Sequence, residues 1–274
     1  MERAAAEVSG LDPQTGSSQS IKLSIQNLTC RFGEVLALNN FSLDVAEGEF
    51  VCILGASGCG KSTLFNAVSG LLRATSGKIV LDGRDVSNRP GQVGYMLQKD
   101  LMLPWRTVLG NITLGASLTR GATKKDRDEA AELATRYGLG EFLNHYPHAL
   151  SGGMRQRVAM MRTIAAGRQV MLLDEPFGAL DAQTRLSMQQ WLLQVWRDLG
   201  RTILFVTHDV DEAIFLADRI VVMTPRPGRI AEILEVRLAR PRTLEDLTTE
   251  TFITIKRRIM DWLYHEPASD GAAP

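Results

Sequence analysis

Apolar and polar residues follow three different periods along the chain, and each period predicts a different kind of element. From Ile21 to Val51 they alternate, with breaks at Gly33 and Gly48, which predicts short antiparallel strands joined by turns. Continuous apolar runs predict buried strands in the segments EFVCILG (49–55), VMLLDEP (170–176) and TILFVTH (202–208). Helical spacing then appears in KSTLFNAVSGLL, SMQQWLLQVWRDL and DEAIFLAD. Buried strands alternating with helices predict an α/β fold with a mostly parallel sheet.

The same patterns divide the chain into parts. Residues 1–20 are rich in small and polar residues without periodicity, which predicts a flexible tail. Residues 21–240 hold the predicted α/β core with its antiparallel β layer. Within it, about residues 99–166 carry a helical pattern such as DRDEAAELATRYGL, with Ala and Leu on one face, which predicts an inserted helical subdomain. In residues 241–274, the sequence pattern predicts a C-terminal helix, FITIKRRIMDWLY, followed by a disordered tail, HEPASDGAAP.

Charge and composition narrow the class of partner. Lys plus Arg and Asp plus Glu both number 31, so no global basic field attracts nucleic acid or an anionic membrane. No apolar run approaches the roughly 18 residues of a membrane span, and the N-terminus lacks the apolar core of a signal peptide. The three cysteines fit free thiols in a reducing compartment. We therefore expect a protein of the cytoplasmic side, without a nucleic-acid partner, that reaches a membrane only through another protein.

The segment GASGCGKS satisfies the phosphate-loop pattern at every fixed position and stands between a predicted strand and a predicted helix. The backbone N–H groups of such a loop form an anion nest, Lys61 reaches the β and γ phosphates, and Ser62 ligates Mg²⁺. The residues predicted to hold nucleotide are Gly55, Ala56, Ser57, Gly58, Cys59, Gly60, Lys61, Ser62 and Thr63. The alternative, a glycine-rich turn that binds nothing, is disfavoured by the strand and helix on its two sides.

Other polar residues follow the apolar strands. Asp174 and Glu175 end VMLLDE, where alternation along the strand would aim them differently: Asp174 would hold Mg²⁺ through water and Glu175 would polarise an attacking water. His208 follows TILFVT and is predicted to emerge at the same sheet edge, and the Gln98 amide is placed to reach Mg²⁺ or the water. The alternatives are a pair of solvated acids, an ordinary surface or core histidine and an unremarkable glutamine.

Taken together, these segments resemble the ATP-binding subunit of an ABC transporter over about residues 21–235. LSGGMRQR (150–157) resembles that family's signature, VMLLDEP its Walker B strand with the catalytic Glu, and GALD its D-loop. VTHD resembles its switch histidine and MLQ its glutamine loop. The resemblance implies a P-loop ATPase fold, ATP and Mg²⁺ as cofactors, and ATP hydrolysis carried by Glu175, His208, Gln98 and Lys61.

The signature turn also has a physical interpretation of its own. Ser151, Gly152 and Gly153 begin a predicted helix, whose exposed N–H groups and dipole form a second anion site. In the family this turn grips the γ-phosphate held by another subunit, which implies a head-to-tail dimer with Asp181 facing the partner chain. The resemblance also implies that Phe32 stacks on adenine. The alternative for Phe32 is a core or turn aromatic.

Two departures narrow the branch of the family. Met154 follows the signature glycines, where Gln is common in the family. The segments LSGGMRQR and LMLPWRTVLGNI both resemble those of ATP-binding subunits of nitrate, sulfonate and taurine importers. We therefore expect transmembrane permease subunits, a second ATP-binding subunit (identical or sibling) and, indirectly, a solute-binding protein outside the membrane as partners. The protein is then peripheral, on the cytoplasmic face of the cell membrane. Pro104 and Trp105 are interpreted as part of a groove that receives a permease helix, with a core anchor as the alternative.

Three other functions stay open at this point. They are an importer of another small solute such as a pyrimidine, an exporter subunit, and a non-transport ABC ATPase acting on ribosomes or DNA. The last class usually joins two nucleotide-binding domains or inserts a long coiled coil, whereas this chain has one predicted domain, a compact helical insertion and no basic surplus.

Overall fold

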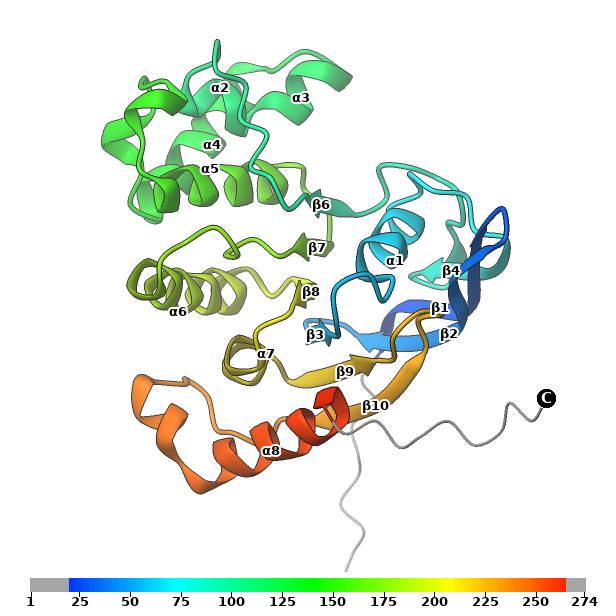
Figure 1. The fold of residues 1–274 in the computed structure, drawn as a ribbon. Coiled ribbons are helices and arrows are strands. Elements are labelled where there is room, and N and C mark those ends of the chain that lie inside the picture. Colours follow the sequence, from blue (N-terminus) through cyan, green and yellow to red (C-terminus); the bar gives the residue numbers. More distant parts are fainter. Residues whose placement is uncertain (1–19, 265–274) are drawn as a thin grey trace, which may run out of the picture.

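The computed structural model describes residues 20–264, and within them the central feature is a six-stranded sheet in the order β10-β9-β3-β8-β7-β6 (Figure 1). Every neighbouring pair is parallel except β10 and β9, which are antiparallel. The strands are β3 (Phe50–Leu54), β6 (Gly94–Met96), β7 (Val170–Asp174), β8 (Thr202–Thr207), β9 (Arg219–Met223) and β10 (Ile230–Glu235). The predicted α/β fold with a mostly parallel sheet is confirmed.

The central strands are buried on both faces, which explains their continuous apolar runs. In β3, Phe50 and Cys52 face one hydrophobic cluster while Val51 and Ile53 face another. Helix α1 (Lys61–Val68) packs on the second face, and α6 (Ala182–Leu199) and α7 (Val210–Leu216) pack on the first (Figure 1).

The predicted antiparallel layer exists, but its first two strands are long rather than short. The described layer runs in the order β2-β1-β4-β5, with β1 (Ile21–Phe32), β2 (Val35–Ala46), β4 (Ser76–Leu81) and β5 (Arg84–Asp85). β1 and β2 have 12 residues each and contain several register shifts. Each shift changes which residues face the core, so a single long strand has the sequence pattern of several short ones.

Between β6 and β7 the chain is helical and lies beside one end of the main sheet (Figure 1). This region contains α2 (Val108–Ile112), α3 (Leu114–Thr119), α4 (Lys124–Arg136), η1 (Gly140–Phe142), η2 (Pro147–Ala149) and α5 (Gly152–Ala165). In α4 the buried residues are Ala130 and Ala134, and a capping box formed by Thr123 and Asp126 begins the helix. The helical content agrees with the sequence pattern, and the subdomain bounds stay a prediction.

The C-terminal part contains η3 (Leu244–Thr248) and α8 (Glu250–Tyr264). The amphipathic helix predicted here is confirmed: Phe252 and Ile259 are buried in the first cluster. The predicted flexible tail (1–20) and the predicted tail HEPASDGAAP lie outside the described residues, except for residue 20. Across residues 20–264, no helix combines the length and apolarity that a bilayer crossing requires.

Candidate active site

The candidate site lies where the parallel strands end. Because β9, β3, β8, β7 and β6 run parallel and side by side, their carboxyl ends meet at one edge of the sheet. The segments that leave these ends carry, in the same spatial order, Arg226, the phosphate loop, His208, Glu175 and Gln98. A cavity of ≈ 260 Å³ opens here, lined by Ala37, Ser57, Gly58, Gly60, Lys61, Ser62, Thr63, Gln98, Glu175 and Arg226.

The phosphate loop is a tight backbone turn that requires its glycines. Gly58 and Gly60 have φ of 78° and 111°, in the region that favours glycine. A Cβ atom on Gly60 would also lie 2.8 Å from Leu38 Cδ2. The buried Lys61 ammonium donates to the carbonyl oxygens of Gly55 at 2.7 Å and Ala56 at 3.1 Å. The structure thus places the lysine in contact with the loop at the start of α1, as the sequence pattern predicts.

Asp174 and Ser62 place a carboxylate and a hydroxyl side by side next to the loop. Asp174 is buried at the end of β7, where it accepts hydrogen bonds from Ser62 and, at 3.4 Å, from Tyr95. Burial raises the pKa of the Asp174 carboxyl, the hydrogen bond from Ser62 opposes this shift, and the nearby charge of Glu175 adds to it.

These residues fit Mg²⁺ bound together with a nucleotide. Mg²⁺ prefers oxygen ligands and is usually held by one or two carboxylates plus substrate phosphates. Within residues 20–264, no group of three or more His, Cys, Asp or Glu side chains is placed to hold a metal ion by itself.

Glu175 joins Gln98 and His208. Its Oε2 atom accepts a hydrogen bond from Gln98 Nε2 at 3.3 Å and lies 3.2 Å from His208 Nδ1. Asp174 and Glu175 do aim differently, but the reason is not strand alternation: β7 ends at Asp174, and Glu175 has a left-handed φ of 44°. An uncommon backbone conformation for a non-glycine residue therefore orients this carboxylate.

The signature turn lies next to the D-loop of its own chain instead of the phosphate cavity. Ser151 caps α5 by accepting the Met154 N–H at 3.3 Å, and Asp181 caps α6 by accepting the Thr184 N–H at 3.0 Å. A Cβ atom on Gly153 would lie 2.9 Å from Thr184 Cγ2, which accounts for glycine at that position. Ser151, Gly152, Gly153 and Asp181 do not line the cavity described above.

Two aromatic residues singled out in the sequence are exposed. Phe32, at the end of β1, is 49% exposed, so it is not a core aromatic, and it does not line the cavity. Trp105 is 71% exposed, which rules out the core-anchor alternative. Both rings are accessible to another molecule.

Sequence reasoning missed several arginines that connect the predicted motifs. On α5, Arg155 pairs with Asp100 at 3.3 Å and Arg162 donates to the Leu101 carbonyl at 2.9 Å, which ties the segment after Gln98 to the signature helix. The positive charges of MRQRVAMMR were the available signal.

Two more arginines belong to this group. Arg185 donates to Asp209, next to His208, at 3.2 Å and to the Leu180 carbonyl, next to Asp181, at 3.1 Å. Arg226 donates to the carbonyl oxygen of Gly58 at 3.2 Å. The segment TPRPGR directly after the apolar IVVM was a possible signal for Arg226.

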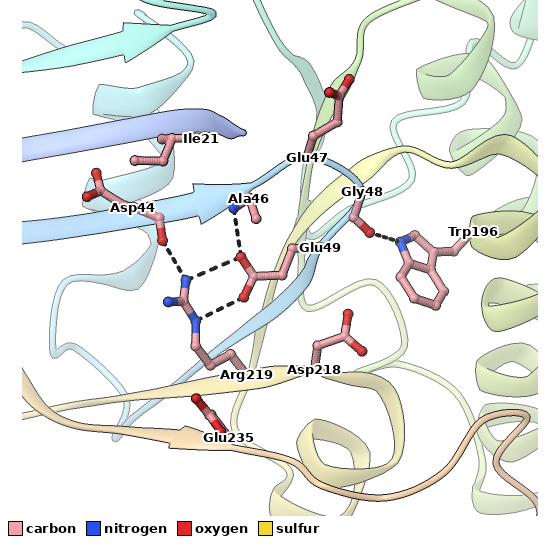
Figure 2. A pocket seen from close by; sticks show the side chains of 10 residues that line it. All are labelled: Ile21, Asp44, Ala46, Glu47, Gly48, Glu49, Trp196, Asp218, Arg219 and Glu235. Carbon is pink, nitrogen blue, oxygen red and sulfur yellow. Dashed lines mark hydrogen bonds and ion pairs between the residues drawn. The ribbon is translucent and has the colours of Figure 1, made fainter. Parts of the chain in front are cut away.

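A larger hollow of ≈ 650 Å³ lies at the opposite edge of the sheet, where β3 and β9 begin (Figure 2). Its carboxylates are largely engaged: Glu49 pairs with Arg219 at 2.9 Å and Asp218 with Arg240 at 2.7 Å. The Trp196 indole donates to the Gly48 carbonyl, as Figure 2 shows. These contacts account for the polar groups structurally, so size alone does not make this hollow the functional site.

Gly228 packs directly against the backbone of the phosphate loop at Cys59, and this contact leads to a prediction about stability. A Cβ atom at this position would lie 2.2 Å from the Cys59 carbonyl oxygen, a contact with rigid backbone. We expect Gly228→Ala to lower the free energy of unfolding by about 1–3 kcal/mol through overpacking, measured by urea denaturation. Gly115→Ala in α3 is the matched control, since a Cβ there meets nothing within 4 Å. Equal stability of Gly228→Ala and the unchanged protein would contradict this packing.

Comparison with known proteins agrees with this geometry. Residues 38–178 match the ABC transporter family. An uncharacterised ABC transporter ATP-binding protein of Methanocaldococcus jannaschii is 45% identical over 251 residues, covering 90% of this chain and 92% of that protein. The taurine import ATP-binding protein of Rhizobium johnstonii is 43% identical over 211 residues, covering 77% of this chain and 80% of the relative.

Solved structures give the same result for the fold. A dimeric ATP-binding cassette in a post-hydrolysis state, bound to ADP and Pi, is 31% identical, with a TM-score of 0.67 over 79% of this chain and all of that one. A sheet edge that presents a phosphate loop and an acidic strand end is typical of P-loop NTPases. Together with the family match, this means that the chain belongs to the ABC transporter family as an ATP-binding subunit with ATPase activity.

Proposed function

We propose that this subunit hydrolyses ATP to drive an importer of the nitrate, sulfonate or taurine type. The observation that carries the hydrolytic part is the contact of one carboxylate, Glu175, with both Gln98 and His208 at the mouth of the phosphate cavity. The importer part is supported by the 43% identity with a taurine import ATP-binding protein. The long coiled coil that many non-transport ABC ATPases insert has no counterpart in α2–α5, of which the longest helix has 14 residues.

The proposed roles follow from the positions of the residues. Glu175 accepts a proton from the attacking water, and Gln98 and His208 orient that carboxylate. His208 would also contact the γ-phosphate. Lys61 and the loop N–H groups stabilise charge that develops on the phosphates. Phe32, exposed at the end of β1, is proposed to stack on adenine.

Mg²⁺ would be held by Ser62, with Asp174 through water and Gln98 as further ligands. When bound, Mg²⁺ neutralises phosphate charge during in-line attack. The chain's own contribution is a buried carboxylate and a hydroxyl that already lie in hydrogen-bond contact.

We further propose that two ATP-binding subunits complete each site. Ser151 lies exposed at the N-terminus of α5, away from its own phosphate cavity, so its hydroxyl and the start of α5 can meet the γ-phosphate of a second chain. The hydroxyl oxygen accepts the Met154 N–H, which leaves its hydrogen for the phosphate. Asp181, beside this turn, would face the partner.

The permease contact is proposed at the segment after Gln98. Leu101 and Trp105 are 52% and 71% exposed, and arginines from the signature helix hold this segment. A permease helix seated here would connect the γ-phosphate state at Gln98 to the membrane. The subunit would then be peripheral, at the cytoplasmic face of the cell membrane, with a solute-binding protein acting on the permease from the other side.

The test is purification of a tagged chain from its native membrane. We expect a multi-spanning permease to co-purify, and the ATPase rate of the reconstituted complex to rise with taurine, an alkanesulfonate or nitrate when the solute-binding protein is supplied. A Lys61→Ala chain should bring down the same permease without solute-stimulated ATPase. Recovery of ribosomes or DNA in place of a permease would overturn the importer proposal.

A further inference from the structure

We propose that Arg226 is a positioning residue for the ATP polyphosphate: it fixes the turn of the phosphate loop at Gly58 and adds a second cation to the mouth of the cavity. This inference rests on the proposed placement of ATP in the phosphate-loop cavity. Arg226 leaves the sheet after β9, the strand that lies beside β3 on the side away from β8, so it approaches the loop from the side opposite to Glu175 and Gln98.

The contact is made with a carbonyl that works against phosphate binding. Gly58 has φ of 78°, and the turn around it is closed by the Cys59 N–H, which donates to the Ala56 carbonyl at 3.3 Å. In this turn the Gly58 oxygen accepts from Arg226 Nη2 at 3.2 Å. A carbonyl oxygen in a phosphate loop repels an anion, whereas the N–H groups attract it. A guanidinium on that oxygen fixes the peptide orientation and offsets its partial negative charge.

The segment that carries Arg226 is itself held in place. The Gly228 N–H donates to the Ala37 carbonyl at 2.9 Å, and the Asn39 N–H donates to the Gly228 carbonyl at 3.0 Å. The Thr224 hydroxyl donates to the Pro227 carbonyl at 3.2 Å. Proline on each side of Arg226 further restricts the backbone. The guanidinium therefore starts from a fixed base that also contacts the loop at Cys59.

Its charge is not neutralised by a neighbour. Among residues 20–264, no carboxylate lies within ion-pair distance of Arg226, although it is exposed and lines the cavity. Lys61 is the other cation of the cavity, and its ammonium is directed to two loop carbonyls. An arginine has five N–H donors, so the one given to Gly58 leaves others that can donate to an anion bound in the cavity.

The test compares Arg226→Gln and Arg226→Lys with Arg229→Gln, a matched control on the same loop that does not line the cavity. For Arg226→Gln we expect the KM for ATP to rise about five- to tenfold while kcat changes less than about twofold, because a charge-assisted contact is lost from binding. Arg226→Lys should recover part of the loss. The difference from the unchanged protein should shrink as salt is raised, since exposed charges are screened.

A merely structural role would lower the thermal midpoint and kcat, and would be insensitive to salt. The inference is overturned if Arg226→Gln keeps the KM within about twofold, if Arg229→Gln has the same effect, or if the loss does not depend on salt. Lys61→Ala, measured in parallel, separates the two proposals. If Lys61→Ala binds ATP normally, the placement of ATP itself is wrong; if it loses ATP while Arg226→Gln does not, only the inference about Arg226 is wrong.

Discussion

Glu175→Gln is expected to bind ATP and to hydrolyse it at least about 100-fold more slowly than the unchanged protein, because the amide cannot accept a proton from water. The substitution keeps the shape of the side chain, and its amide oxygen still accepts from Gln98, whose Nε2 lies 3.3 Å from Oε2 in the present structure. Bound ATP should then persist in the site that two subunits are proposed to share, so ATP should convert the variant from a monomer to a stable dimer.

Two measurements check this expectation: phosphate release at saturating ATP and size-exclusion chromatography with and without ATP. Glu132→Gln, an exposed acid on α4, is the matched control and should retain the original rate. A Glu175→Gln protein that releases phosphate at the rate of the unchanged chain would contradict the general-base role.

Lys61→Ala should lose ATP affinity by about 10- to 100-fold, the effect of removing one or two charge-assisted hydrogen bonds to phosphate. Lys61 is buried at the start of α1, and in the present structure its ammonium donates to loop carbonyls at 2.7 Å and 3.1 Å, with Cys59 Sγ at 3.9 Å. Phosphate oxygens are stronger acceptors for this cation, so nucleotide binding should redirect it.

Calorimetric titration with ATP measures the loss, and Lys78→Ala, at an exposed position of strand β4, controls for the general effect of removing a positive charge. Unchanged affinity in Lys61→Ala would mean that ATP binds elsewhere. Since the second cation of the cavity is Arg226, the double variant should bind more weakly than either single one.

Most of the candidate site could be predicted from the sequence because the topology of a parallel sheet decides which residues meet. Once three apolar runs are assigned to neighbouring parallel strands, the residues after them, including Glu175 and His208, must meet at one edge. TPRPGR after the apolar IVVM indicates a turn at the end of a strand, but the role of Arg226 could not be predicted because it depends on the long-range pairing of β9 with β3.

Other features could not be predicted because they depend on local backbone geometry. The long strands β1 and β2 have the sequence pattern of short strands because register shifts interrupt the alternation of their side chains. The orientation of Glu175 depends on a left-handed φ that neither its residue type nor its neighbours indicate. The exposure of Trp105 could not be predicted either, since a Trp beside a Pro can lie in the core or at the surface.

We propose that two chains share each ATP site, with the phosphate loop from one and the signature turn from the other. Mixing two inactive variants tests it most directly: Lys61→Ala removes the loop cation, and Ser151→Asp keeps a good helix cap but puts negative charge where the γ-phosphate should arrive. A mixed dimer contains one intact site, so the mixture should recover up to about a quarter of the original ATPase rate, as expected for random pairing of two-site dimers. A mixture no more active than its two components would contradict the shared site.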